Sequence, residues 1–114
     1  MFKSVYGTMY YVDNMKSAVD FYKTKWGIQP SHESPDWTEF AVGDHNICLH
    51  AKRAGETYRQ NGVMIFNAEG VKGLFDKMGS QGIKVSGLHE VHPGHWTFHG
   101  YDNSDNEFSF YGSP

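Results

Sequence analysis

Residues 11–28 read YVDNMKSAVDFYKTKWGI and pass from a strand into an amphipathic helix. Apolar side chains recur along the helical part at intervals of three or four residues, which predicts one buried stripe. They are Met15, Ala18, Val19, Tyr22 and Trp26. Asp13 or Asn14 can cap the first turn, because a short polar side chain accepts hydrogen bonds from N–H groups that have no partner within the helix. Gly27 is a typical residue to end it.

A second helix with the same kind of stripe is predicted in the other half of the chain. Its apolar side chains are Val71, Leu74, Phe75 and Met78, and Gly79 and Gly82 follow them. Runs of β-branched and aromatic residues predict strands outside the helices. These runs are residues 5–12, 37–42, 46–50, 63–66, 95–101 and 107–111.

The two halves of the chain repeat one pattern of strand, helix and three strands. Trp26-Gly27-Ile28 is echoed by Gln81-Gly82-Ile83, and Asp36-Trp37-Thr38 by His95-Trp96-Thr97. One such unit is too small to bury its own sheet. We predict an α+β fold in which two tandem βαβββ modules form a curved mixed eight-stranded sheet, a cup, with the helices on its convex face. The expected organisation is a single domain, 1–114, with module one at about 1–50, a connection at about 51–62 and module two at about 63–114.

Composition excludes several classes of protein. The chain has 114 residues, a formal net charge of −3 and one cysteine, Cys48. Modules that bind nucleic acid are normally basic, so we expect no nucleic-acid partner. One cysteine cannot build a disulfide framework or a multi-cysteine zinc site. No apolar run is long enough to span a bilayer, so we expect no membrane partner and a cytoplasmic location.

Two motifs resemble, in order and spacing, those of the vicinal oxygen chelate superfamily, which includes glyoxalase I, the extradiol dioxygenases and the bleomycin-binding proteins. The first motif is residues 11–22 followed by Trp26-Gly27-Ile28, and the second is residues 102–110, DNSDNEFSF. The resemblance covers nearly the whole chain. It implies the eight-stranded cup with a small-molecule ligand inside. It also implies a homodimer, because cups of this family usually pair and exposed sheet edges need cover.

The resemblance also implies where a metal ion would bind. Metalloenzymes of this family hold a divalent ion with His, Gln or Glu at four strand positions, which correspond here to Gly7, Cys48, Val63 and Ser109. Glycine and valine have no ligating side chain, and a catalytic metal needs about three protein ligands. We therefore predict no cofactor. The alternative is a divalent metal at a non-standard site formed by Cys48, His50 and His99.

The histidines include a run with the spacing of a zinc motif, His92-x2-His95-x3-His99. The Pro93-Gly94 pair within it argues against a helix. On a strand, His95 and His99 share a face but lie about 13 Å apart at ~3.3 Å per residue. Both cannot reach one ion through metal–nitrogen bonds of ~2.1 Å.

Cys48 corresponds to a ligand position of the family and is therefore expected to point into the cup. Because side chains alternate along a strand, the other residues of the cup face are assigned by counting from it. On the seventh strand, the fosfomycin-resistance transferases, which also belong to this superfamily, place residues that contact the substrate at positions corresponding to Thr97 and His99. The predicted ligand-binding residues are Tyr11, Trp37, Glu39, Asn46, Cys48, His50, His95, Thr97, His99 and Ser109. Aromatic walls with a few polar groups are typical of a small-molecule pocket. Structural roles fit some of these residues equally well: Cys48 as a small buried apolar side chain, and Glu39 as a solvated carboxylate at a sheet edge.

Two functions fit this predicted site. The first is a metal-free binding protein, like the bleomycin-resistance branch of the family, for a small aromatic or cationic ligand. Trp37 would stack on the ligand and Glu39 would pair with positive charge. The alternative is an enzyme of lyase, isomerase or dioxygenase type. It would use either the metal site around Cys48, His50 and His99 or acid–base catalysis by Glu39 and His99.

Overall fold

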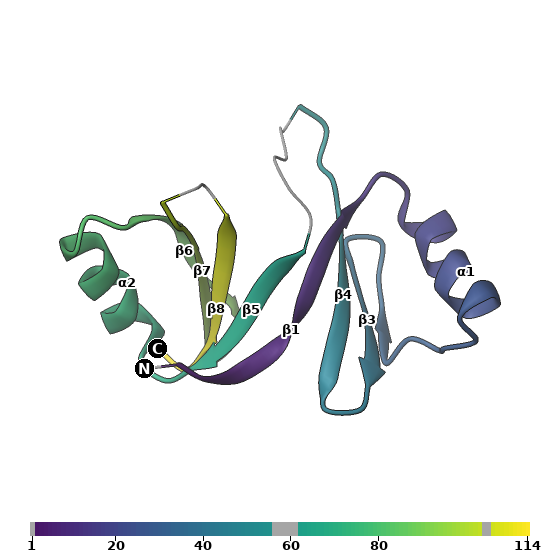
Figure 1. Ribbon diagram of the computed structural model, residues 1–114, viewed down its shortest axis with the longest axis horizontal. Coiled ribbons are helices and arrows are strands. Elements are labelled where there is room, and N and C mark those ends of the chain that lie inside the picture. Colours follow the sequence, from purple (N-terminus) through teal and green to yellow (C-terminus); the bar gives the residue numbers. More distant parts are fainter. Residues whose placement is uncertain (1, 56–61, 104–105) are drawn as a thin grey trace. The chain divides into compact units, whose positions relative to one another are not determined.

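The fold is α+β, as predicted, and its elements follow the βαβββ order twice (Figure 1). A computed structural model describes residues 2–55, 62–103 and 106–114, and these residues contain two helices and eight strands. The first repeat comprises β1 (Phe2–Val12), α1 (Met15–Lys25), β2 (His32–Glu33), β3 (Trp37–Val42) and β4 (His45–Ala51). The second comprises β5 (Val63–Ala68), α2 (Val71–Ser80), β6 (Lys84–His92), β7 (His95–Tyr101) and β8 (Glu107–Gly112). The strands form one mixed sheet in the order β2-β3-β4-β1-β5-β8-β7-β6.

Two compact units divide these elements. One is Gly7–Gly62, here named the Gly7 unit, and the other combines Met1–Tyr6 with Val63–Pro114, here named the Val63 unit. Strand β1 therefore begins in the Val63 unit and ends in the Gly7 unit. Part of the predicted connection, residues 56–61, lies outside the described residues.

Helix α1 begins where the sequence predicts and is capped by one of the two predicted residues. The Oδ1 atom of Asn14 accepts a hydrogen bond from the backbone N–H of Ser17 at 2.9 Å. This bond satisfies one of the N–H groups that have no partner in the first turn. Val19 lies at the centre of the buried stripe and packs with Phe40 of β3 and Leu49 of β4. Gly27 follows the helix with a φ of 69°, a backbone conformation that favours glycine.

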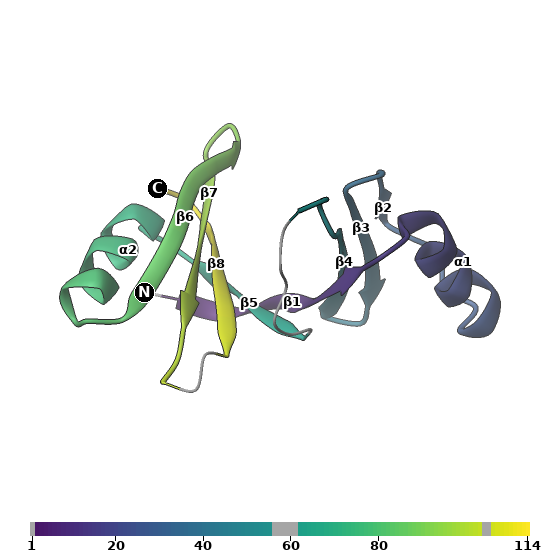
Figure 2. The same ribbon diagram turned by 90° about the horizontal axis from the view of Figure 1, so that it is seen from above.

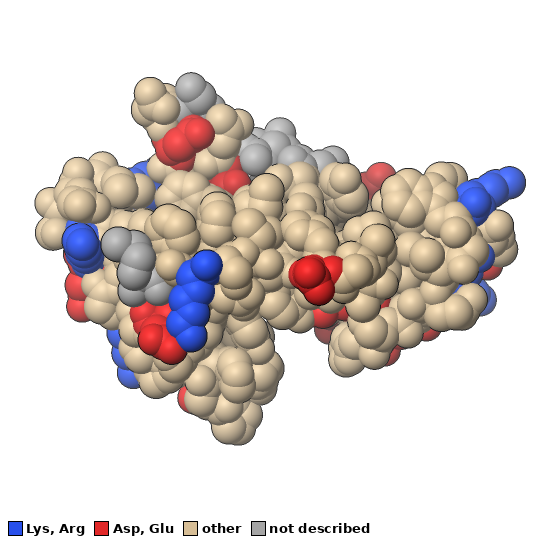
Figure 3. Space-filling model, turned by 60° about the horizontal axis from the view of Figure 1, so that its bottom comes forward, with Lys and Arg blue, Asp and Glu red and all other residues tan. Residues whose placement is uncertain are grey.

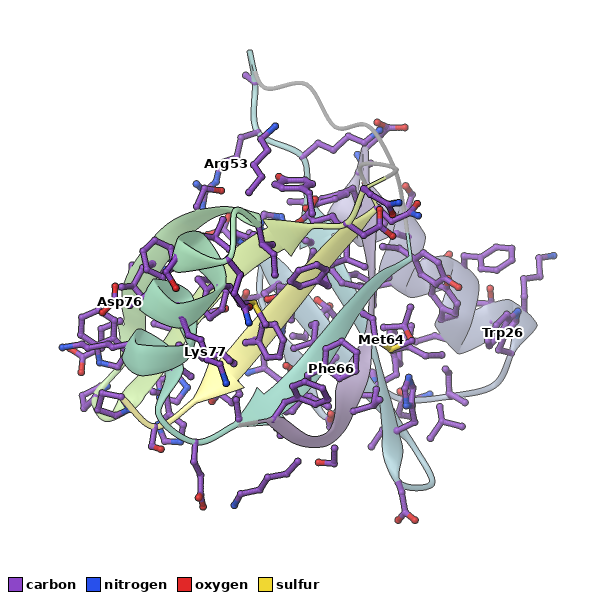
Figure 4. All side chains as sticks on the ribbon, turned by 60° about the vertical axis from the view of Figure 1, so that its left-hand side comes forward. Trp26, Arg53, Met64, Phe66, Asp76 and Lys77 are labelled. Carbon is purple, nitrogen blue, oxygen red and sulfur yellow. The ribbon has the colours of Figure 1, made fainter. Side chains whose placement is uncertain are left out.

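Trp26 is not buried, contrary to the prediction that it belongs to the apolar stripe. Helix α1 ends at Lys25, so Trp26 is the C-cap residue, and 57% of its surface is exposed. Its side chain projects from the end of α1 (Figure 4), and its ring meets that of Tyr22 edge to face at 4.9 Å. The helical spacing fails here because the residue lies past the last turn that packs on the sheet.

The strands of the Gly7 unit pair in the register that alternation requires. Strand β1 runs parallel to β4, and β3 runs antiparallel to β4 after the turn at Gly43. Phe40 and Leu49 are fully buried against α1. Because successive side chains of a strand point to opposite faces, Glu39 and Cys48 lie on the other face.

The core of the Val63 unit combines aliphatic side chains with several aromatic rings. Strands β5 and β8 are parallel, and β8, β7 and β6 form an antiparallel series, with α2 packed on it (Figure 2). The buried core residues are Ala68, Val71, Leu74, Phe98 and Phe110. Phe2 at the start of β1 meets the rings of Phe66 and Phe110 at 5.2 and 5.5 Å. These contacts explain why the first residues of β1 group with this unit.

Strand β6 has no clear alternation in the sequence, although a strand was expected after the second helix. Gly87 interrupts it with a φ of 72°, and its register with β7 shifts on both sides of residues 89 and 90. Such shifts turn side chains out of phase, so the period-two pattern is lost.

Candidate functional site

One face of the Gly7 unit carries six of the predicted ligand-binding residues. They are Tyr11, Trp37, Glu39, Asn46, Cys48 and His50. In the register of the sheet, His50 lies between Tyr11 on β1 and Trp37 on β3, and Cys48 is the partner of Glu39. This face is opposite the one that packs on α1, as the alternation predicts.

Four of these side chains contact one another and form what we name the Trp37 cluster: Tyr11, Trp37, Glu39 and His50. The indole Nε1–H of Trp37 donates a hydrogen bond to Oε2 of Glu39 at 2.7 Å. The ring of His50 stands edge to face against Trp37 at 5.7 Å and against Tyr11 at 5.4 Å. All four residues are half-buried, so each combines a fixed position with an accessible surface.

A backbone hydrogen bond determines which ring nitrogen of His50 donates a hydrogen. The Nδ1 atom lies 2.8 Å from the carbonyl oxygen of Ala51. A carbonyl oxygen only accepts, so Nδ1 carries the hydrogen and donates it. Nε2 of the neutral ring is then a hydrogen-bond acceptor.

Cys48 lies beside this cluster as a neutral thiol. It is fully buried, and burial, together with the nearby charge of Glu39, raises the pKa of the thiol to about 12. The thiolate is the form that attacks electrophiles and binds metal ions. At neutral pH this side chain therefore behaves as a small apolar group.

Asn46 lies on the same face, two residues before Cys48. It is half-buried, and its Cα partners are Gly7 on β1 and Ala41 on β3. Its position places an amide on the same face of β4 as His50, four residues earlier along the strand.

The other four predicted residues, His95, Thr97, His99 and Ser109, belong to the Val63 unit. Thr97 donates its hydroxyl hydrogen to the carbonyl oxygen of Phe110 at 2.7 Å, and its Oγ1 lies 3.3 Å from Oγ of Ser109. Nδ1 of His99 lies 3.4 Å from Oε2 of Glu107, on the adjacent strand β8. These polar groups are engaged largely with their own sheet.

His95 has neighbours different from those of Thr97 and His99. Its ring contacts His92, the residue opposite it in the β6–β7 hairpin, and stacks on Tyr111 of β8. His92 and Tyr111 are not among the predicted ligand-binding residues. Alternation along β8 does predict Tyr111 on the same face as Ser109, two residues earlier, whereas the pairing of His92 depends on the hairpin register.

The four positions that correspond to metal ligands in the family do not fit a metal ion. Gly7 and Val63 offer no donor, and a Cβ atom at Gly7 would collide with the carbonyl oxygen of Asn46. The thiol of Cys48 is held neutral, and Ser109 is buried with its hydroxyl close to Thr97. Within residues 2–55, 62–103 and 106–114, no three His, Cys, Asp or Glu side chains are placed to hold an ion together. We derive no chemistry through a metal at these positions.

Comparison with protein families identifies the class of this protein. Residues 7–110 match the family model of the Glyoxalase/Bleomycin resistance protein/Dioxygenase superfamily. The chain belongs to this superfamily. Among curated proteins, none matches the sequence.

Solved structures with the same fold have low sequence identity to this chain. Methylmalonyl-CoA epimerase from Mycobacterium tuberculosis has a TM-score of 0.78 at 13% identity, covering 99% of this chain and 90% of the epimerase chain. The epimerase from Streptomyces coelicolor, in complex with 2-nitronate-propionyl-CoA, has a TM-score of 0.78 at 12% identity and full coverage of both chains. A structure described as NAD-dependent benzaldehyde dehydrogenase from Legionella pneumophila has a TM-score of 0.74 at 19% identity, covering 95% and 98% of the two chains. At these identities the likeness establishes the fold.

The surface gives two further observations. On the face drawn in Figure 3, the lysine and arginine side chains are scattered, and some of them lie beside acidic side chains. Neither helix in the part of the chain that the structure describes is long and apolar enough to cross a membrane.

Proposed function

We propose that this protein binds a small planar ligand, either cationic or an aromatic ring with N–H donors, at the Trp37 cluster. The observation that carries the proposal is the hydrogen bond between the Trp37 indole and the Glu39 carboxylate, with His50 and Tyr11 packed beside it. A rigid aromatic surface and a carboxylate placed together are the features that recognise such a ligand.

Trp37 would supply the stacking surface. Its indole is oriented by two independent contacts, the hydrogen bond to Glu39 and the edge of the His50 ring. A ring that is already fixed loses little conformational freedom when a ligand stacks on it. Stacking or cation–π contact with tryptophan is worth about 1–2 kcal/mol when the site is partly desolvated.

Glu39 would supply charge recognition. A carboxylate has two oxygens with several acceptor sites, so its bond to the indole leaves it able to accept from a ligand as well. The carboxylate is half-buried, and in such surroundings a charge attracts a cation more strongly than in open water. His50 would orient the ligand through its Nε2 acceptor.

The alternative function, an enzyme acting through Cys48, receives less support from the site. A metal ligand or nucleophile at this position would have to be a thiolate, and the pKa of Cys48 is about 12. Acid–base catalysis by Glu39 remains compatible with the geometry. It differs from simple binding in one measurable way: turnover of a bound ligand would stop in Glu39→Gln while stacking on Trp37 persisted.

The test uses two small probes, benzyltrimethylammonium as the cation and benzyl alcohol as the neutral aromatic. Binding is followed by tryptophan fluorescence in the native protein, Trp37→Ala, Glu39→Gln and Trp96→Phe. Trp96 is the control, because its ring lies under the ammonium group of Lys72 in the Val63 unit. We expect Trp37→Ala to weaken cation binding about 10-fold. Glu39→Gln should weaken binding of the cation but not of the alcohol. Equal affinity for the cation in the native protein and Trp37→Ala would contradict the proposal.

A further inference from the structure

Two histidines face each other across the turn that joins β6 and β7. His92 is the last residue of β6 and His95 the first of β7, and they are partners in the hairpin register. Figure 2 shows the two strands running side by side to this turn. The turn residues are Pro93 and Gly94, and Gly94 has a φ of 79°, as a tight turn with glycine at its third position requires. The spacing that resembles a zinc motif in the sequence thus becomes a cross-strand pair.

A tyrosine lies beside these two histidines, so three side chains that can bind a metal ion are grouped together. The rings of His92 and His95 lie 4.4 Å apart, and the ring of His95 stacks on Tyr111 at 5.4 Å with an interplanar angle of 21°. The Oη atom of Tyr111 lies 2.9 Å from Nε2 of His92. Tyr111 is itself packed against Tyr6 at 5.5 Å, which holds it in place from the other side.

The backbone of the turn selects the nitrogen that His95 presents. Its Nδ1 lies 3.2 Å from the carbonyl oxygen of Pro93 and therefore carries the hydrogen. The lone pair of the neutral ring is then on Nε2. Metal-binding histidines have the same arrangement, in which one ring nitrogen donates to a carbonyl and the other binds the ion.

We propose that His92, His95 and Tyr111 form a binding site for a divalent transition metal ion with square-planar preference, namely Cu²⁺. Two ligands on one ion, about 2.0 Å from it and 90° apart, are separated by ~2.9 Å, which is the distance already present between Oη of Tyr111 and Nε2 of His92. Two imidazole nitrogens and one oxygen are a donor set that favours Cu²⁺ over Zn²⁺, Mg²⁺ or Ca²⁺. Water would complete the coordination. The phenol would bind as phenolate and release its proton to solvent.

The charge at the turn favours a cation. Oε2 of Glu90 accepts a hydrogen bond from the backbone N–H of Gly94 at 3.2 Å, so a carboxylate lies at the same turn. None of the three donors stands at the four family positions tested above. The site lies in the Val63 unit, and it shares no residue with the Trp37 cluster.

The test is titration of the untagged, chelator-free protein with CuCl₂, followed by electron paramagnetic resonance and visible absorption. We expect one equivalent to bind with nitrogen hyperfine coupling and a phenolate-to-copper absorption band. His92→Ala and His95→Ala should each weaken binding at least about 10-fold, and Tyr111→Phe should abolish the absorption band. His89→Ala is the matched control, because His89 is another exposed histidine of β6, whose Nδ1 lies near the carbonyl of Gly87.

Each outcome decides for or against the proposal. Loss of binding in the His92 and His95 variants, with native affinity in His89→Ala, supports it. Native affinity in both His92→Ala and His95→Ala overturns it and assigns the copper to adventitious groups such as the N-terminus. An unchanged absorption spectrum in Tyr111→Phe also overturns the proposal, because the proposed site includes the phenolate of Tyr111. Circular dichroism of each variant separates loss of ligands from loss of folding.

Discussion

The Gly7 and Val63 units have the same order of elements, but their tryptophans lie on opposite faces of the strands. Trp37 faces away from α1 and contacts Glu39 and His50, whereas Trp96 packs on the core beneath α2. The sequence repeat that matches Trp37 with Trp96 is therefore shifted by one residue from the structural match. When the fully buried Phe40 is matched with the fully buried Phe98, Trp37 corresponds to His95 and Glu39 to Thr97. A slip of one residue moves a side chain to the other face of a sheet, so the chemistry of the two units differs although their topology does not.

The largest expected effects test this match between Phe40 and Phe98. Replacing either by alanine should destabilise the protein by about 3–5 kcal/mol, because each substitution leaves a large cavity in a filled core. Urea denaturation followed by circular dichroism measures the loss. A cost below about 1 kcal/mol for one of them would show that the two residues are not equivalent core positions.

A second difference between the units lies in their glycines. Gly7→Ala places a Cβ against the carbonyl oxygen and Cβ of Asn46, on the parallel strand β4, and should cost about 1–3 kcal/mol. Gly73→Ala is the control: it lies inside α2 with open space around it, and alanine there should add about 0.5–1 kcal/mol of stability. Both values come from the same denaturation experiment. A neutral Gly7→Ala would mean that β1 and β4 separate without penalty.

Alkaline pH should destabilise the Gly7 unit through Cys48. The pKa of this thiol is raised from 9.0 to about 12, so between these values the unfolded chain loses a proton that the folded chain keeps. The contribution of Cys48 to stability is then constant below about pH 8 and falls by about 1 kcal/mol per pH unit above pH 9. The stability of Cys48→Ala should fall less steeply with pH over this range.

The native protein and Cys48→Ala are compared by the slope of stability against pH. Absolute stabilities would also differ, because alanine leaves a small cavity that destabilises the variant at every pH. Tyr22, whose pKa is raised by burial and by Tyr10, contributes to both slopes and cancels. Identical slopes for the native protein and Cys48→Ala between pH 8 and pH 10.5 would contradict a neutral, buried thiol.

The smallest expected effect concerns the helix caps. The side chain of Asn14 caps α1, whereas α2 begins at Gly70 without a side-chain cap. Asn14→Ala should cost about 1 kcal/mol in the same urea experiment. A value near zero would indicate that packing of Val19 alone holds the first turn.

The sequence predicts the fold well where periodicity is regular. The stripes of α1 and α2 and the alternation in β3, β4 and β7 follow from side-chain spacing alone. The prediction that Trp26 is buried is wrong, because spacing carries no information on where the last packed turn of the helix ends. Strand β6 was not located because Gly87 and two register shifts disrupt its alternation.

The candidate site was predicted less completely than the fold. Alternation places Trp37, Glu39 and His50 on one face, but it does not predict the hydrogen bond from the indole to the carboxylate. That bond depends on rotamers of two side chains on one strand. The contact between His92 and His95 depends on a two-residue turn, and Tyr111 joins them only through the pairing of β7 with β8.

The most direct measurement of the central claim is the shift of the tryptophan indole N–H resonances as benzyltrimethylammonium is added. The three tryptophans report on different places: Trp26 at the end of α1, Trp37 on the proposed site, and Trp96 beneath α2. We predict a saturable shift of the Trp37 resonance, whose N–H is bonded to Glu39, with those of Trp26 and Trp96 unchanged. A Trp37 resonance that stays in place while the cation binds would contradict a site at the Trp37 cluster.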